Sequence, residues 1–83
     1  MYQVEIKKHA FKYISRLDKP TAKRIRDAID KISEDPHIGE RLTNHKASYK
    51  FRVGDYRILY DIYEERVLII VIKVQGRGDV YNR

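Results

Sequence analysis

The feature that most constrains this chain is a Gly54-Asp55 pair that joins two segments of alternating hydrophobic and polar residues. The alternation runs through Tyr49–Val53 and again through Tyr56–Tyr63, and a period of two is typical of half-buried strands. Glycine at the first central position of a two-residue loop suits a type II′ turn. The sequence therefore predicts a β-hairpin with this turn at its tip.

A two-residue turn also fixes which residues face each other across the hairpin. It places Arg52 directly opposite Arg57, with Lys50 diagonally close on the same face. Like charges directly opposite one another destabilise a hairpin, so a purely structural hairpin has no reason to contain them. The same register puts Phe51 and Ile58 together on the other face, where helices can cover them. The basic face is then expected to point outward.

Two helices are expected before the hairpin. Residues 9–17 and 20–35 carry apolar side chains at the spacing of an amphipathic helix. Pro20 fits the first turn of the second helix, where its missing N–H costs nothing. Asp18 or Thr21 can accept hydrogen bonds from the free N–H groups of that turn.

The remaining segments complete a small sheet. Residues 2–6 alternate like a strand, and residues 67–74 are apolar on both faces apart from Lys73, as expected for a central strand. Residues 37–48 have no clear period and indicate a surface loop. Residues 75–79 indicate a second loop, which is followed by a short final segment at 80–81. The expected fold is α+β, in the order β-α-α-β-β-β, with a mainly antiparallel sheet and two helices on one face.

The composition favours a single basic domain. A chain of 83 residues organises one core, so residues 1–83 are expected to form one domain. Lys and Arg number 18 against 12 Asp and Glu, a formal net charge of +6, which favours a polyanionic partner although solubility explains it equally well. The charges are spread along the chain, with Asp27 four residues before Lys31 as an expected helical ion pair. Any binding surface must therefore be assembled by the fold.

Several kinds of protein are excluded. The chain has no cysteine, so disulfides and thiolate ligands are excluded, and no two of its three histidines are spaced to bind one metal ion. No phosphate-cradling glycine loop or serine nucleophile motif is present, and no cofactor is expected. The longest apolar stretch, residues 67–72, is far shorter than the roughly 20 residues that span a bilayer, and no signal peptide is evident. A soluble cytoplasmic protein is expected.

Five residues within 49–81 are the candidate site: Lys50, Arg52, Arg57, Arg77 and Tyr81. Arg77 stands between two glycines just after the last long strand, from which its guanidinium can reach a phosphate held over the basic face. Tyr81 follows shortly after as a platform on which an unpaired base can stack. Together these residues indicate a site that handles RNA phosphates.

A structural interpretation remains open for each of the five. The lysine and the first arginine can be ordinary solvent-facing strand residues, and the tyrosine can cap the sheet edge. Arg57 and Arg77 can be held in surface ion pairs with Asp61 and Asp79. The convergence of all five favours the functional interpretation.

The chemistry that remains is RNA cleavage without metal or protein nucleophile, in which the 2′-OH attacks the neighbouring phosphate. This reaction needs a base for the 2′-OH, cations for the phosphorane and an acid for the leaving 5′-oxygen. Lysine and arginine can fill all three roles where crowding of like charges lowers a lysine pKa.

Two motifs resemble the RelE/ParE superfamily of bacterial and archaeal toxins, and its RelE branch in particular. They are residues 49–60, YKFRVGDYRILY, and residues 74–81, VQGRGDVY. The resemblance implies that Lys50 and Arg52 hold phosphate and supply the base, that Arg57 stabilises the transition state, that Arg77 is a general acid or phosphate ligand, and that Tyr81 stacks on the nucleotide. Some relatives carry a histidine just before the loop arginine, where this chain has Gln75-Gly76, so a histidine base is not available.

The resemblance further implies a ribosome-dependent, metal-independent endoribonuclease that cuts translated mRNA in the A site and is neutralised by a RelB-like antitoxin. Leu59, Ile70 and Ile72, near the basic face, are candidates to receive that antitoxin. Two alternatives remain: a ParE-like toxin that inhibits gyrase without cutting RNA, and a non-catalytic nucleic-acid-binding module.

Overall fold

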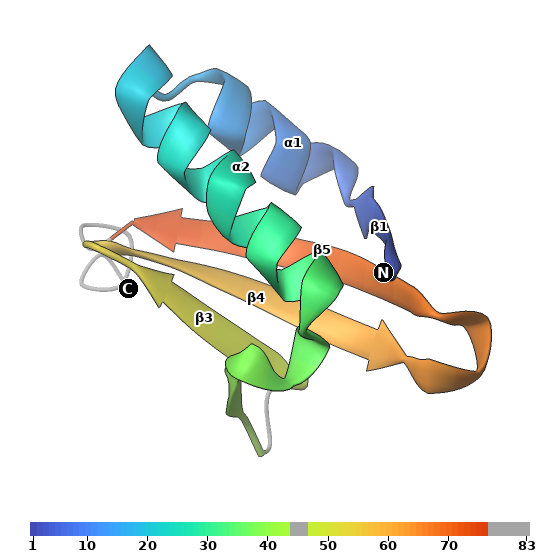
Figure 1. The fold of residues 1–83 in the computed structure, drawn as a ribbon. Coiled ribbons are helices and arrows are strands. Elements are labelled where there is room, and N and C mark those ends of the chain that lie inside the picture. The colour runs from blue at the N-terminus through green and yellow to red at the C-terminus, as the bar shows by residue number, and fades with distance from the viewer. Residues whose placement is uncertain (44–46, 77–83) are drawn as a thin grey trace.

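The computed structural model describes residues 1–43 and 47–76, which form two helices against one face of a twisted sheet (Figure 1). The described elements, including two short 3-10 helices, follow in chain order: β1 (Gln3–Ile6), α1 (Lys8–Ser15), α2 (Lys19–Glu34), η1 (Pro36–Ile38), β2 (Glu40–Arg41), β3 (Tyr49–Val53), β4 (Tyr56–Tyr63), η2 (Glu64–Arg66) and β5 (Leu68–Gly76). None of these helices has the length and apolar character needed to cross a membrane.

The strands of the described residues form one sheet in the order β1-β5-β4-β3-β2. Strand β1 pairs with β5 in parallel, whereas the other pairs are antiparallel. The predicted α+β class and element order are confirmed. Two loop predictions were wrong. The expected loop at 37–48 contains the short strand β2, and Gln75 and Gly76, expected in a loop, belong to β5.

Helix α2 begins where the sequence predicts. Asp18 is its N-cap, and its Oδ2 accepts hydrogen bonds from the backbone N–H of Thr21 at 3.3 Å and from the Thr21 hydroxyl at 3.1 Å. These hydrogen bonds lower the pKa of the Asp18 carboxyl. The expected ion pair within the helix was wrong, because Asp27 accepts from Lys23 at 3.0 Å instead of pairing with Lys31.

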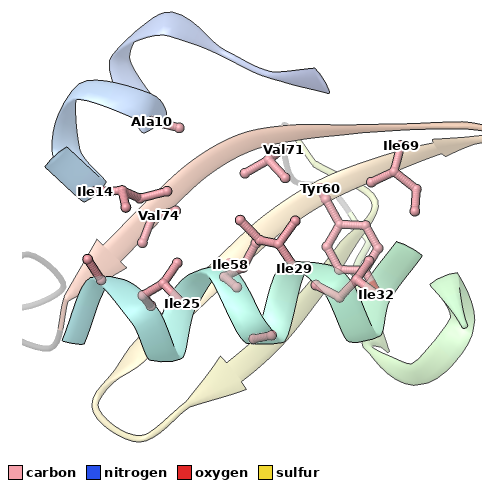
Figure 2. Close-up of a cluster of buried hydrophobic side chains, with 12 residues drawn as sticks. Ala10, Ile14, Ile25, Ile29, Ile32, Ile58, Tyr60, Ile69, Val71 and Val74 are labelled. Atoms are coloured by element: carbon pink, nitrogen blue, oxygen red, sulfur yellow. The ribbon is translucent and has the colours of Figure 1, made fainter. Parts of the chain in front are cut away.

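The core lies between the helices and the sheet (Figure 2). Its side chains come from α1, α2, β4 and β5, and those that are fully buried and largest are Tyr60, Ile25, Ile32, Ile58, Ile69 and Val71. Isoleucine and valine at alternate strand positions and at helical spacing supply this layer, as the sequence predicts.

Tyr60 is the one fully buried residue of this group that carries a polar atom. Its side chain is 0% exposed, and its hydroxyl donates a hydrogen bond to the carbonyl of Pro36 at 2.7 Å. Burial raises the pKa of Tyr60 to about 12. The tyrosine thereby ties the centre of β4 to η1, the segment that leads into β2.

Strand β5 carries a bulge that the sequence did not predict. Leu59 pairs with Lys73 but Tyr60 pairs with Val71, so Ile72 is an extra residue on β5. A bulge shifts the alternation of faces by one position. Val71 and Val74 therefore both reach the core although they are three residues apart.

The turn between β4 and β5 contains a strained residue. After η2, Val67 adopts φ 50° and ψ 48°, and its N–H donates to the carbonyl of Glu64 at 3.2 Å. The left-handed region is unfavourable for an L-residue with a branched Cβ.

Candidate functional site

The β3–β4 hairpin has the predicted register. Arg52 pairs with Arg57, Phe51 with Ile58 and Lys50 with Leu59. A type II′ turn requires a positive φ at its first central residue and not at its second. Gly54 has φ +59° and Asp55 does not have a positive φ, so both residues meet this requirement. The hairpin therefore places the two arginines directly opposite one another, with Cβ atoms roughly 5 Å apart.

The basic side chains lie on the sheet face that the helices do not cover. Phe51 and Ile58 pack into the helix-covered layer, and residues next to them in a strand point to the opposite face. Among the described residues, no helix packs on that opposite face (Figure 1). We call Lys50, Arg52 and Arg57 the hairpin cluster.

The two arginines of the hairpin cluster have no carboxylate partner among residues 1–43 and 47–76. The alternative in which Asp61 holds Arg57 is not realised: no ion pair joins these two residues, and Asp61 Oδ1 instead accepts from the backbone N–H of Ser48 at 2.8 Å. Arginines that face one another without a carboxylate between them are arranged to bind an anion.

Lys50 differs from the arginines because it has an acidic neighbour. Its side chain is 22% exposed, and its Nζ lies 3.8 Å from Glu40 Oε1. Glu40 occupies β2 directly opposite Lys50. No sequence pattern indicates this carboxylate, because a two-residue strand is too short to show a period.

The other two predicted site residues, Arg77 and Tyr81, lie outside the described residues. The described part of β5 ends at Gly76, which pairs with Tyr56, while the preceding Gln75 pairs with Arg57. The roles of Arg77 and Tyr81, and the alternative ion pair of Arg77 with Asp79, stay predictions.

A separate polar network lies where β1, η1, η2 and β3 meet. Glu64 accepts a hydrogen bond from the Tyr2 hydroxyl at 2.6 Å and lies 2.8 Å from His37 Nε2, and Tyr49 lies 3.3 Å from His37 Nδ1. The hydrogen bonds from Tyr2 and then His37 lower the pKa of Glu64, and the bond to Glu64 raises the pKa of Tyr2. These contacts join four elements, which is a structural role.

The hairpin cluster can bind and polarise a phosphodiester. Two guanidinium groups can each donate two hydrogen bonds to phosphate oxygens, and the cations can stabilise the extra negative charge of a five-coordinate phosphorane. Leu59, Ile70 and Ile72 lie half-buried on strands β4 and β5. This surface therefore places cations that suit a phosphate beside apolar side chains.

Comparison with known proteins defines the class. A sequence profile described as ParE toxin of type II toxin-antitoxin system, parDE, matches residues 4–81. A protein of Escherichia coli named as a RelE-like toxin is 33% identical over an alignment 86 residues long, which covers 98% of this chain and 90% of that protein. Toxin RelG of Mycobacterium tuberculosis is 33% identical over 58 residues, 68% of this chain and 67% of that toxin. The chain belongs to the RelE/ParE superfamily, the toxins of type II toxin–antitoxin systems.

Solved structures agree with the RelE side of this superfamily. The archaeal RelE–RelB complex from Pyrococcus horikoshii contains a chain that matches with a TM-score of 0.80 and 26% identity, covering 93% of this chain and 96% of that one. The isolated E. coli RelE toxin matches in fold with a TM-score of 0.81 and 24% identity, covering 98% and 92%. The protein is a RelE-like toxin.

Proposed function

We propose that this toxin is a ribosome-dependent endoribonuclease that cuts translated mRNA in the A site without a metal ion. The observation that carries the proposal is the pair of opposed arginines on an uncovered sheet face, without carboxylate partners among the described residues. Keeping two like charges together costs folding stability, and binding a phosphodiester removes that repulsion.

In the proposed reaction the 2′-oxygen attacks the adjacent phosphorus, the O2′–P bond forms and the P–O5′ bond breaks. The 2′-OH proton passes to a base of the site, and a proton is given to the leaving 5′-oxygen. Lys50 and Arg52 hold the phosphate and supply the base, and Arg57 stabilises the phosphorane. Arg77 serves as general acid or phosphate ligand, and Tyr81 stacks on the nucleotide; both assignments rest on sequence alone. The products are a 2′,3′-cyclic phosphate and a 5′-OH.

The proposed protein partner is a RelB-like antitoxin. The P. horikoshii structure and a structure from E. coli are complexes of RelE with RelB. A segment with acidic and apolar side chains would complement both the hairpin cluster and the neighbouring Leu59, Ile70 and Ile72. Such a partner would cover the proposed site.

Primer extension on a message translated with and without the protein tests the activity. We expect ribosome-phased cuts, and we expect Arg57→Ala to reduce the cleavage rate roughly 10²–10³-fold, the usual effect of removing one preorganised charge donor. Arg66→Ala is the matched control, because Arg66 is an exposed arginine of η2. A 2′-deoxy nucleotide at the cut position should prevent cleavage. Cutting by Arg57→Ala at the wild-type rate would refute the proposal.

A second candidate is inhibition of DNA gyrase, because the matching profile carries the ParE name. In that case gyrase incubated with the toxin accumulates cleaved DNA and translated messages stay intact. A non-catalytic nucleic-acid-binding module would instead show salt-sensitive binding with neither product. The same preparation of protein can be used in all three assays.

A further inference from the structure

A cavity of about 300 Å³ lies between α2 and β3. On α2 it is lined at positions 24, 27, 28 and 31, a spacing that puts all four residues on one side of the helix. On β3 it is lined by Phe51, Arg52 and Val53. The cavity therefore shares Arg52 with the hairpin cluster.

The charges around the cavity favour an anion. The lining has three basic residues, Arg24 and Lys31 on α2 and Arg52, whose side chain leaves β3 on the other face, and Asp27 is its one acidic residue. The Asp27 carboxylate is already paired with Lys23 at 3.0 Å. Within residues 1–43 and 47–76, no ion pair holds any of the three cations.

Arg24 lies against the tip of the hairpin that carries the proposed site. A Cβ built on Gly54 would come within 2.6 Å of Arg24 Nη2. The guanidinium therefore packs against the turn that separates Arg52 from Arg57. This position extends the cationic surface from the sheet face, around the hairpin tip, to α2.

The edge of the sheet is open at the cavity. Strand β2 pairs with β3 only at Tyr49 and Lys50, so no described strand covers residues 51–53 on that side. The apolar part of the lining includes Phe51 and Val53, which are only partly buried. A strand of RNA that leaves the hairpin cluster over this edge meets apolar surface surrounded by cations.

We propose that this cavity binds the nucleotide next to the cleaved phosphodiester, with Arg24 and Lys31 on its phosphate and its base or ribose against Phe51 and Val53. This inference rests on the proposed function. A nucleotide supplies both a phosphate for the basic side chains and a flat ring for the apolar part of the lining. An acidic peptide would suit the basic side chains equally well. Because the cavity adjoins Arg52 of the hairpin cluster, the RNA proposed to bind that cluster is favoured.

The test compares Arg24→Gln and Lys31→Gln with Arg26→Gln, an equal loss of charge at an exposed position of α2 that does not line the cavity. On translating ribosomes, each of the first two variants should raise the protein concentration for half-maximal cleavage about 3–10-fold and leave the maximal rate within about twofold. Each should also lower the slope of log affinity against log salt by about 0.7, the value for one phosphate contact to a single strand. Arg26→Gln should stay near the wild type.

A second measurement is independent of cleavage. Fluorescence anisotropy at low salt, with a short single-stranded RNA, should show the same ranking of the three variants. Circular dichroism checks that each folds, and Lys31→Gln keeps the test valid if Arg24→Gln loosens the turn.

The inference is overturned if Arg24→Gln and Lys31→Gln match Arg26→Gln in both assays. It is also overturned if they cut and bind RNA normally but resist the antitoxin, because the occupant is then a peptide. If the wild type cuts no message, the proposed function fails, and the anisotropy ranking still decides whether the cavity holds RNA.

Discussion

The hydroxyl of Tyr60 offers a sharp test of how the fold is held together. Tyr60→Phe removes one oxygen from a side chain that is 0% exposed and that donates to Pro36 at 2.7 Å. The buried carbonyl of Pro36 then loses this donor, which should cost about 1–3 kcal/mol. For a domain of this size each kcal/mol lowers Tm by roughly 4–8 °C.

The same substitution should change how stability depends on alkaline pH. The pKa of Tyr60 is about 12 in the folded chain, against roughly 10 when unfolded. Between these values the unfolded chain has released the proton and the folded chain has not, so raising the pH favours unfolding. The contribution of the Tyr60 hydroxyl to stability is complete below pH 10 and is lost towards pH 12. The loss amounts to about 1.4 kcal/mol per pH unit.

Urea unfolding of wild type, Tyr60→Phe and Tyr63→Phe at pH 7, 10 and 11 measures both effects. Tyr63 is a matched control, because it lies on the same strand and is 41% exposed. The stability gap between wild type and Tyr60→Phe should be largest at pH 7 and shrink above pH 10. A gap that is constant with pH, or a smaller loss than in Tyr63→Phe, would refute the reasoning.

Two further predictions concern the turn around η2. Val67→Asn should raise stability by about 1 kcal/mol, because asparagine tolerates the left-handed conformation that valine adopts at φ 50°; a lower urea midpoint would count against this. Glu64→Gln should destabilise the protein at neutral pH, because it removes the charge bonded by Tyr2 and His37. Since the folded pKa of Glu64 is lowered, its contribution is lost as pH falls through that pKa. The difference from wild type should therefore fade towards pH 3 in thermal melts, and a difference that grows in acid would contradict the assignment.

Local signals explain why the register of the hairpin that carries the candidate site could be predicted from sequence. The register of Arg52 against Arg57 follows from a two-residue turn and from alternation within 15 residues of chain, both of which are short-range properties. The N-cap of α2 is equally local, because Asp18 and Thr21 are three residues apart. Features of this kind depend little on the rest of the fold.

The features that sequence did not reveal all depend on tertiary placement. Glu40 reaches Lys50 only because β2 is added to the sheet edge. Arg24 and Lys31 reach the neighbourhood of Arg52 only because α2 packs beside β3. No period or motif in the sequence carries this information.

The parallel pairing of β1 with β5 has a consequence for synthesis of the toxin. About 65 residues of chain separate Gln3 from its partner Leu68, which a ribosome making roughly 5–20 residues per second needs about 3–13 s to add. Until β5 is made, β1 has no partner strand and β4 is paired on one side only, with β3. Such long-range pairing is also slow to form. The nascent toxin therefore spends its synthesis without a completed sheet. An antitoxin that is already present in the cell can therefore reach the nascent toxin before the toxin has folded.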